Sequence, residues 1–391
     1  MARRLTRVFF VLGAAAVVLL AGTVVVLVRE PGGRDAATHV RAGRSQAALP
    51  TNPPGCRGPG GSASPSVPGG KATSAAVPIP GTRAIDTHGY VPLDVVTVDG
   101  VTWVSLRDPN SDPNAPRGLL GRVDADSVGP VIPVVDGCTV GALAGAAGAV
   151  WVGTCDERGV TGATSGGGLV RVDGHSGAIT GRAALPTRCV VDVVAGKGSV
   201  WAAGVAESGQ PELLARVDPA TATVTASQQL TKATLAGLAL TDQGLWAQEL
   251  GGTTQVVHFD DAGNQLAAVP SKEETLVGTS GGALWFKLTD GSAVVERDSA
   301  NGNVIATTPL AHIQSASAGP SGVWVQQATT GSLTVTVTRV DAASGAADQS
   351  FQYQAPTLDR TGRPFVGSVV ADEHGVWVVY QGRLSHYDLA T

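Results

Sequence analysis

Short apolar runs separated by Gly-rich polar turns fill the chain from about residue 78 to its C-terminus. One unit contains four such runs in order: Thr139 to Ala144, Ala149 to Gly153, Gly168 to Asp173 and Ala178 to Leu185. Apolar runs of about five or six residues bounded by Gly turns are typical of β-strands. Four in succession predict an antiparallel meander, so the pattern predicts an all-β domain over residues 78–391.

Every Trp of the chain stands in the second run of such a unit, after a Gly-containing turn. An Asp marks the third run, and a basic residue precedes it by two positions in six units and by one position in the unit of Trp285. The tryptophans are Trp103, Trp151, Trp201, Trp246, Trp285, Trp324 and Trp377. The aspartates are Asp124, Asp173, Asp218, Asp260, Asp298, Asp341 and Asp388, and the basic residues are Arg122, Arg171, Arg216, His258, Arg297, Arg339 and His386. A doublet that recurs at intervals of roughly forty residues indicates a repeat architecture. The sequence therefore predicts a seven-bladed β-propeller with four antiparallel strands in each blade.

The last unit supplies three apolar runs before the chain ends, Val366 to Ala371, Gly375 to Gln381 and Arg383 to Leu389. One unassigned run, Gly81 to Thr87, precedes the first unit where a fourth strand would lie. We predict that it joins the C-terminal blade and closes the ring, which leaves no open sheet edge between first and last blades. In this ring each Trp is a wedge between neighbouring sheets, and each Asp accepts backbone N–H groups of the next turn.

The N-terminal segment predicts a membrane anchor. Arg3, Arg4 and Arg7 precede an uncharged apolar stretch, Val8 to Val28, that is long enough as a helix to cross a bilayer. A cleaved signal peptide is the alternative, but its apolar region is shorter and ends at a small-residue cleavage site. We therefore predict a signal anchor at 8–28, with residues 1–7 in the cytoplasm by the positive-inside rule. The protein is then single-pass, with everything after the anchor outside the cytoplasmic membrane.

Residues 29–77 are dense in Pro, Gly, Ser and Ala and show no apolar periodicity. Such a segment cannot bury enough apolar surface to offset its ordering entropy, which predicts a disordered tether.

Charged residues make up only 15% of the chain, the net charge is −5, and the basic residues are dispersed. This composition argues against nucleic acid as a partner, because its binders cluster Lys and Arg.

The four cysteines form no CxxC or Cys/His spacing, so the sequence predicts no zinc site. Cys138 and Cys155 are equidistant from the Gly145 to Gly148 turn and are candidates for a disulfide across a hairpin. Cys189 begins the corresponding strand of the next unit, and Cys56 lies in the tether as a spare thiol or a partner for Cys189. Any disulfide implies an oxidising compartment.

In a propeller, the loops from second to third strands and from blade to blade share one face. The longest of them here are Arg107 to Arg117, Thr154 to Gly167 and Gln354 to Arg363. They predict that a ligand binds on this face, near the first, second and seventh blades.

The first loop carries oxygen-bearing side chains at alternate positions, as calcium loops do, with Asp108, Asn110 and Asp112 as the candidate ligands. The turn Gly and the later Glu of such loops are absent, which favours a solvated Asx turn, and the sequence predicts no metal or other cofactor.

Positions on the innermost strands can be counted back from each Trp. The residues nine positions back are Asp94, Ala142, Asp192, Gly237, Leu276, Ser315 and Ser368. Of these, Asp94, Asp192, Ser315 and Ser368 are candidate channel-binding residues, as is Glu273 near the mouth. Glu274 and His312 on adjacent blades are the candidate acid/base pair. The sequence contains no GxSxG, HExxH, GxGxxG or Walker-type motif.

The phrase GALWFKLTDGSAVVERDSANGNV, from Gly282 to Val304, resembles the blades of the virginiamycin B lyase (streptogramin lyase) family. The resemblance covers about Gly81 to Thr391 and implies a seven-bladed propeller. In that family the lyase histidines lie on innermost strands, eleven residues before the Trp. The corresponding positions here are Pro92, Val140, Val190, Leu235, Glu274, Ile313 and Val366. The resemblance thus implies the fold without the catalytic histidines.

The anchor, the tether and the lack of a catalytic motif together predict a membrane-tethered binding, sensing or scaffolding module. Its partner would be a protein or small molecule outside the membrane. An alternative is a lyase or hydrolase that acts on an extracellular small molecule or polymer at the channel mouth. A structural spacer in an envelope complex is a third hypothesis.

Overall fold

The computed structural model describes residues 83–388, except 112–116, 137–138, 156–166, 197, 206–211, 231–232, 252–253, 356, 360–361, 365 and 381. The predicted anchor at 8–28, the predicted tether at 29–77, Cys56 and Cys138 lie outside the described residues. Within the described part, all regular elements are strands, and a helix suited to crossing a bilayer is not among them.

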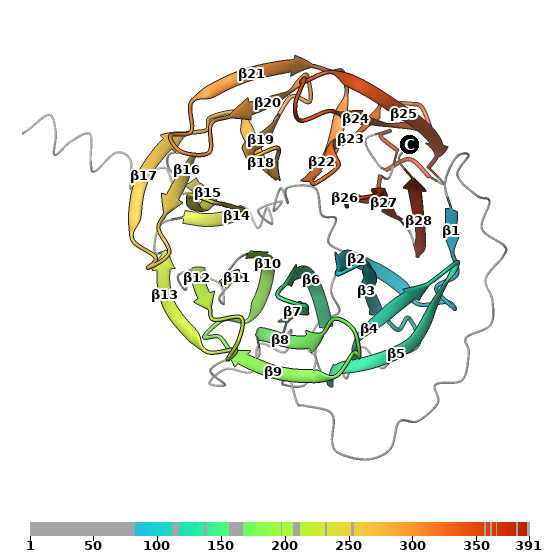
Figure 1. Ribbon diagram of the computed structural model, residues 1–391. Helices are drawn as coiled ribbons and strands as arrows, with labels where there is room; N and C mark the ends of the chain where they lie inside the picture. Colours follow the sequence, from blue (N-terminus) through green and yellow to red (C-terminus); the bar gives the residue numbers. More distant parts are fainter. Residues whose placement is uncertain are drawn as a thin grey trace, which may run out of the picture. The chain divides into compact units, whose positions relative to one another are not determined.

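The described strands form a ring of seven blades (Figure 1). Blades 1 to 6 are β2–β5, β6–β9, β10–β13, β14–β17, β18–β21 and β22–β25, and blade 7 combines β26–β28 with β1. The strand bounds are β1 Arg83–Ile85, β2 Val91–Val98, β3 Val101–Arg107, β4 Arg117–Asp124, β5 Ser127–Asp136, β6 Thr139–Ala146, β7 Ala149–Cys155, β8 Gly168–Asp173, β9 Ile179–Ala184, β10 Cys189–Gly196, β11 Ser199–Val205, β12 Glu212–Val217, β13 Val224–Leu230, β14 Ala233–Thr241, β15 Gly244–Gly251, β16 Gln255–Phe259, β17 Gln265–Pro270, β18 Glu274–Ser280, β19 Ala283–Leu288, β20 Ala293–Arg297, β21 Val304–Pro309, β22 Ile313–Gly319, β23 Gly322–Ala328, β24 Thr334–Val340, β25 Ala347–Gln354, β26 Ser368–Ala371, β27 Gly375–Tyr380 and β28 Arg383–Asp388. The predicted architecture of seven four-stranded blades is present.

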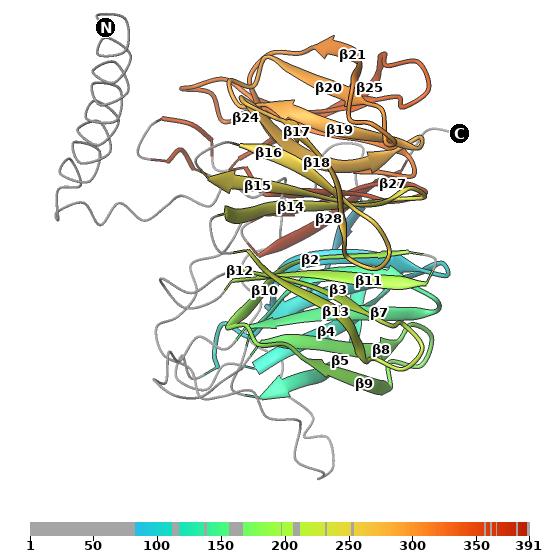
Figure 2. The same cartoon turned by 90° about the vertical axis from the view of Figure 1, so that its left-hand side faces the viewer.

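Each blade is an antiparallel meander whose first strand lies nearest the ring axis and whose last strand lies on the rim (Figure 1). From the side, the blades stack around the ring with their hairpin turns at its two faces (Figure 2). The apolar core is divided among the interfaces between blades. One cluster, for example, joins Trp246 of blade 4 to Leu276 and Phe286 of blade 5. The sheets are therefore held together by side chains that alternate toward the two neighbouring blades.

The tryptophans fill these interfaces. All seven are at most 2% exposed. Trp103 Nε1 donates to the Gly174 carbonyl of the next blade at 2.9 Å. Gly177, in the same turn, has a φ of 75°, and a Cβ there would lie 3.1 Å from the Trp103 ring. The turn thus needs glycine both for its backbone conformation and for close approach of the indole, and the predicted wedge is confirmed.

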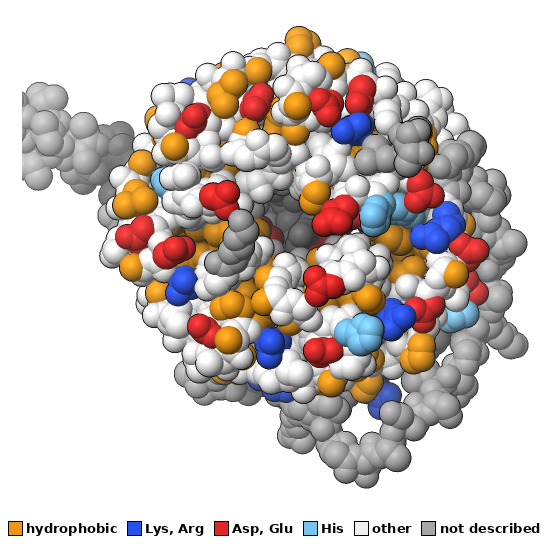
Figure 3. Space-filling model, in the orientation of Figure 1, with side chains coloured by type: hydrophobic (Ala, Val, Ile, Leu, Met, Phe, Trp, Pro, Cys, Tyr) orange, Lys and Arg blue, Asp and Glu red, His pale blue; other side chains and the backbone are white. Residues whose placement is uncertain are grey.

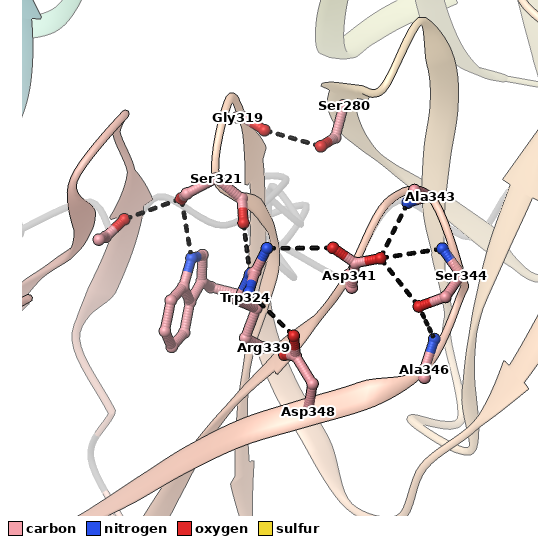
Figure 4. A network of polar contacts seen from close by, with 11 residues as sticks. Ser280, Gly319, Ser321, Trp324, Arg339, Asp341, Ala343, Ser344, Ala346 and Asp348 are labelled. Atoms are coloured by element: carbon pink, nitrogen blue, oxygen red, sulfur yellow. Dashed lines mark hydrogen bonds and ion pairs between the residues drawn. The ribbon is translucent and has the colours of Figure 1, made fainter. Parts of the chain in front are cut away.

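The third-strand aspartates cap the turn that follows them in five blades. Asp341 Oδ1, for example, accepts the N–H groups of Ala343 and Ser344 (Figure 4). The same arrangement occurs at Asp173, Asp218, Asp260 and Asp298. Blades 1 and 7 differ, since Asp124 pairs with Arg122 and Asp388 accepts from His386. The residues after Asp388 lie outside the described part of the chain, so the capping prediction holds in five of the six blades whose turn is described.

The basic residue two positions before the Asp lies opposite the Trp in six blades. His258 stacks on Trp246 with ring centroids 4.5 Å apart, and its Nε2 is 2.9 Å from the Gln243 carbonyl. Arg339 Nε likewise donates to the Ser321 carbonyl (Figure 4). The doublet therefore ties the third strand to the first turn of its own blade and covers the indole.

The ring is closed by the predicted N-terminal strand. Strand β1 pairs antiparallel with β28, with Ile85 opposite Leu384. Ile85 is buried with Trp377 and Leu384 in the cluster shared by blades 7 and 1. Segments from the two ends of the propeller therefore share one sheet, as predicted.

The predicted Cys138–Cys155 disulfide is wrong, because Cys155 pairs with Cys189 of the next blade. The hairpin turn is Ala147–Gly148, both with positive φ, and a bulge between Val140 and Leu143 shifts the ladder. As a result Thr139 faces Cys155 within the hairpin. Cys189 faces Cys155 across the blade interface, with the two Cα atoms 3.9 Å apart. This contact joins blades 2 and 3 into one eight-stranded sheet.

Candidate binding cavity in the propeller channel

A cavity of about 1490 Å³ occupies the ring axis and is lined by the innermost strands of all seven blades. Its lining continues into the turns between first and second strands, such as Asp99–Gly100, Gly281–Gly282 and Asp372–Glu373. Figure 3 shows the hollow at the centre of the ring, with Asp and Glu side chains around it. The cavity therefore lies toward the first-to-second turns, at the opposite end of the channel from the long loops that the sequence pointed to. Binding by those loops, which lie partly outside the described residues, stays a prediction.

Small residues on the inner strands allow neighbouring blades to approach at the axis. A Cβ on Gly145 would lie 2.4 Å from Val98 Cγ2, and one on Gly196 would lie 2.7 Å from Leu240 Cδ2. Close packing of the inner strands leaves apolar side chains along the channel wall. Partly exposed examples are Val96, Val194, Leu240, Val277 and Val370.

The polar lining is acidic. The carboxylates are Asp99, Asp192, Asp242, Asp260, Asp261, Asp372 and Glu373, and the described lining residues include no Lys, Arg or His. Lys197, which follows the lining residue Gly196 in the sequence, lies outside the described residues. Low-dielectric walls lined by one sign of charge concentrate the electrostatic field in the space between them.

Two of the candidates counted back from Trp connect neighbouring blades. Asp192 Oδ1 accepts from its neighbour Val193 N, and Asp192 Oδ2 accepts from Leu238 N of blade 4, both at 2.9 Å. Asp94 makes the same pair of contacts, with Val95 N and with Leu143 N of blade 2. Asp192 lines the cavity, whereas Asp94 is 3% exposed and does not. Both carboxylates therefore have a structural role, and Asp192 also places a charge in the channel.

Asp372 of blade 7 lines the cavity and lies in a buried polar cluster. Its Oδ1 accepts the N–H groups of His374 and Gly375. Its Oδ2 accepts Trp377 Nε1 at 2.7 Å and lies 3.4 Å from His386 Nε2. Burial acts to raise the pKa of Asp372, but the hydrogen bonds and charge of His386 and the Trp377 N–H outweigh it and lower the pKa to about 2.

This shift predicts acid sensitivity at one residue. Because the folded pKa of Asp372 is below its usual value of 3.8, its stabilisation is present above about pH 4 and is lost as pH falls toward 2. Between about pH 5 and about pH 2.5, urea unfolding should show the wild type losing about 2 kcal/mol more than Asp372→Asn. Glu373→Gln, at the exposed neighbour, should keep the wild-type profile. Equal acid losses in wild type and Asp372→Asn would contradict the assignment.

The structure does not bring the candidate acid/base pair together. Glu274 Oε2 lies 2.8 Å from Arg297 Nη2, and both side chains are only 10% exposed. Arg297 also lies over the Phe286 ring, in the interface with blade 4. In this blade Glu296, not the basic residue, faces the Trp, so Arg297 points to the other side of the sheet. His312 is exposed with a φ of 60°.

The remaining candidates lie outside the cavity lining. Glu273 is exposed, Ser368 is buried, and Ser315 is partly buried with no hydrogen bond to its Oγ from the described residues. Asp108 Oδ1 accepts Asn110 N at 2.8 Å, which is the favoured Asx turn, while Asp112 lies outside the described residues. No group of three or more His, Cys, Asp or Glu in the described part of the chain is placed to hold a metal.

Sequence reasoning missed the acidic residues of the cavity mouth, although a signal for three of them is present. Asp99, Asp242 and Glu373 each stand four residues before a Trp, in the turn that leads into the second strand. The count back from each Trp considered only the innermost strands and left out these turns. Whether a turn contacts the channel depends on the tilt of its hairpin, which the sequence does not show.

No protein-family model matches the chain, and no curated protein matches it. Among solved structures it is similar to a streptogramin B lyase structure, with 14% identity, a TM-score of 0.50, and coverage of 80% of this chain and 94% of that one. It is also similar to BamB from Moraxella catarrhalis, with 14% identity, a TM-score of 0.44, and coverage of 78% and 90%. The lyase similarity shows the fold alone. The resemblance to the streptogramin lyase framework is thereby confirmed for the propeller.

Proposed function

We propose that this protein is a binding module held outside the cytoplasmic membrane by its N-terminal anchor, and that its ligand enters the channel from the first-to-second turns. The observation that carries the proposal is the axial cavity, whose volume of about 1490 Å³ exceeds the several hundred Å³ of ordinary ligand sites. Rigid strands from seven blades position its lining, as expected of a preformed site. Binding therefore needs no rearrangement of the ring.

The cellular location rests on the uncharged stretch from Val8 to Val28 and the arginines before it. The Cys155–Cys189 disulfide supports an oxidising compartment, because such bonds persist outside the cytoplasm. An acid/base enzyme finds less support, since the Glu274 carboxylate is engaged by Arg297 in a blade interface. A binding module, by contrast, needs only the axial cavity.

A thermal-shift screen of small molecules and short peptides against the full-length protein in lipid nanodiscs tests the proposal. A stabilising ligand should protect the channel segments 95–100, 192–196 and 369–373 from hydrogen–deuterium exchange. Protection confined to the loops at the other face would instead place the binding site at the second-to-third-strand and blade-to-blade loops that the sequence suggested. A screen that returns no stabilising ligand would contradict a small-molecule or peptide site.

A further inference from the structure

We infer that the channel selects an organic cation, an ammonium or guanidinium group carried on an apolar body. The inference rests on the proposed function and specifies the class of ligand. It combines the axial cavity with two features of its lining: carboxylates at the mouth that make no hydrogen bond or ion pair with the described residues, and an apolar wall behind them.

The mouth carboxylates differ from the other turn aspartates of this propeller. Asp173, Asp218 and Asp341 each accept two backbone N–H groups in their own turns, so their charges serve the fold. Asp99, Asp242, Asp261 and Glu373 are exposed, and no hydrogen bond or ion pair engages their carboxylates within the described part of the chain. These four come from blades 1, 4 and 7 and face one cavity. Their charges are therefore available to a ligand.

The engaged carboxylates add to the same field. Asp192 and Asp260 accept backbone N–H groups, and both carboxylates line the cavity. Like charges that face one another across a low-dielectric space raise the local concentration of a counter-ion and repel an anion. An anionic ligand such as a phosphate or carboxylate would meet no described cation in the lining.

The apolar wall behind the mouth favours a ligand that carries an apolar body next to its cationic group. Val96, Val194, Leu240, Val277 and Val370 are partly exposed to the channel and line the cavity with the carboxylates. Burying the apolar surface of a ligand against such residues favours binding. A bare metal ion cannot use this wall, whereas an alkyl or aryl amine contacts both regions.

Three analogues with one apolar body separate the contributions: 4-phenylbutylamine, 4-phenylbutanol and 4-phenylbutyrate. Ligand-observed NMR with the full-length protein in nanodiscs should give the amine about fivefold or more tighter binding than the alcohol at low ionic strength. The butyrate should bind more weakly than the alcohol. At about 0.5 M salt the preference for the amine should fall to about twofold or less.

The decisive variant neutralises the four free carboxylates with Asp99→Asn, Asp242→Asn, Asp261→Asn and Glu373→Gln. Asparagine tolerates the left-handed conformation at position 99, where φ is 49°, so the turn is retained. The variant should bind amine and alcohol equally. A control with the same change in net charge replaces carboxylates outside the cavity, with Glu249→Gln, Asp290→Asn, Glu296→Gln and Asp348→Asn, and should keep the preference.

The outcomes separate the class of ligand from binding itself. If the three analogues bind equally and protect the channel segments from exchange, the channel binds ligands but the cation inference fails. Loss of the preference in the control variant would also overturn it, since net charge alone would then explain selectivity. If no analogue binds while the screen finds a neutral or anionic channel ligand, the inference is wrong and the proposed function stands.

Discussion

Replacing Trp324 with alanine is expected to lower the free energy of unfolding by about 3–5 kcal/mol, the usual cost of removing a buried aromatic ring. Trp324 is fully buried between blades 6 and 7, where its ring centroid lies 6.4 Å from that of Phe351 and 6.0 Å from that of Tyr387. Its Nε1 donates to Ser321 Oγ, which itself donates to the Gly375 carbonyl of blade 7 (Figure 4). The substitution thus leaves a cavity in the interface and removes one link of a polar chain between blades.

Urea unfolding followed by circular dichroism measures this effect, with Leu266→Ala as the matched control. Leu266 lies on the outer strand of blade 4 and is 57% exposed, so its truncation should change the free energy by about 0.5 kcal/mol or less. Trp324→Phe should fall between the two, because it keeps part of the ring volume and loses the indole donor. If Trp324→Ala costs no more than Leu266→Ala, the wedge assignment is wrong.

The architecture of the propeller could be predicted because its signals repeat. A Trp in each second strand and an Asp at or just after the end of each third strand fix the strand order of a blade, and seven repetitions outweigh any ambiguity in one unit. The ring closure followed from counting, since the last unit lacked one strand and Gly81 to Thr87 supplied it. Repetition thus reports on what all blades share.

Features that belong to one blade could not be predicted in this way. In blade 5 the basic residue Arg297 stands one position before Asp298 instead of two, so Glu296 faces Trp285 and Arg297 points toward Glu274. Side chains alternate between sheet faces, so a single-residue shift exchanges the partners of a strand. A bulge in β6 likewise shifts the hairpin ladder, and Thr139 lies opposite Cys155. Register depends on turn length and bulges, which the apolar pattern does not encode.

The candidate site was predicted only in part. Counting back from each Trp located the innermost strands, and Asp192 from that count does line the cavity. Glu273, Ser315 and Ser368 came from the same count but lie outside the lining, since a strand that runs along the axis exposes few of its residues to the channel. The charges at the mouth come from hairpin turns instead. Their position relative to the axis depends on the tilt and packing of whole blades.

The second large effect is expected at the disulfide. Cys155 and Cys189 close a loop with a sequence separation of 34, and removing such a cross-link frees the unfolded chain by about 3.5–4 kcal/mol at 25 °C in the chain-entropy treatment. The double variant Cys155→Ala, Cys189→Ala should lose this amount in urea unfolding relative to the oxidised wild type. Reduced wild type should unfold with the double variant, because both lack the cross-link.

Identifying the bonded cysteines distinguishes the Cys155–Cys189 disulfide of the structure from the Cys138–Cys155 disulfide that the hairpin spacing suggested. Mass spectrometry of the proteolysed, non-reduced protein should recover the peptides of Cys155 and Cys189 joined, and Cys155→Ala should release a thiol at Cys189 that reacts with maleimide. A peptide joining Cys138 to Cys155 would instead place the bond within blade 2. In that case no disulfide would join blades 2 and 3, whereas the bond in the structure joins the last residue of β7 to the first residue of β10. The stabilisation would also shrink by about 0.6 kcal/mol, because the shorter loop loses less entropy on closure.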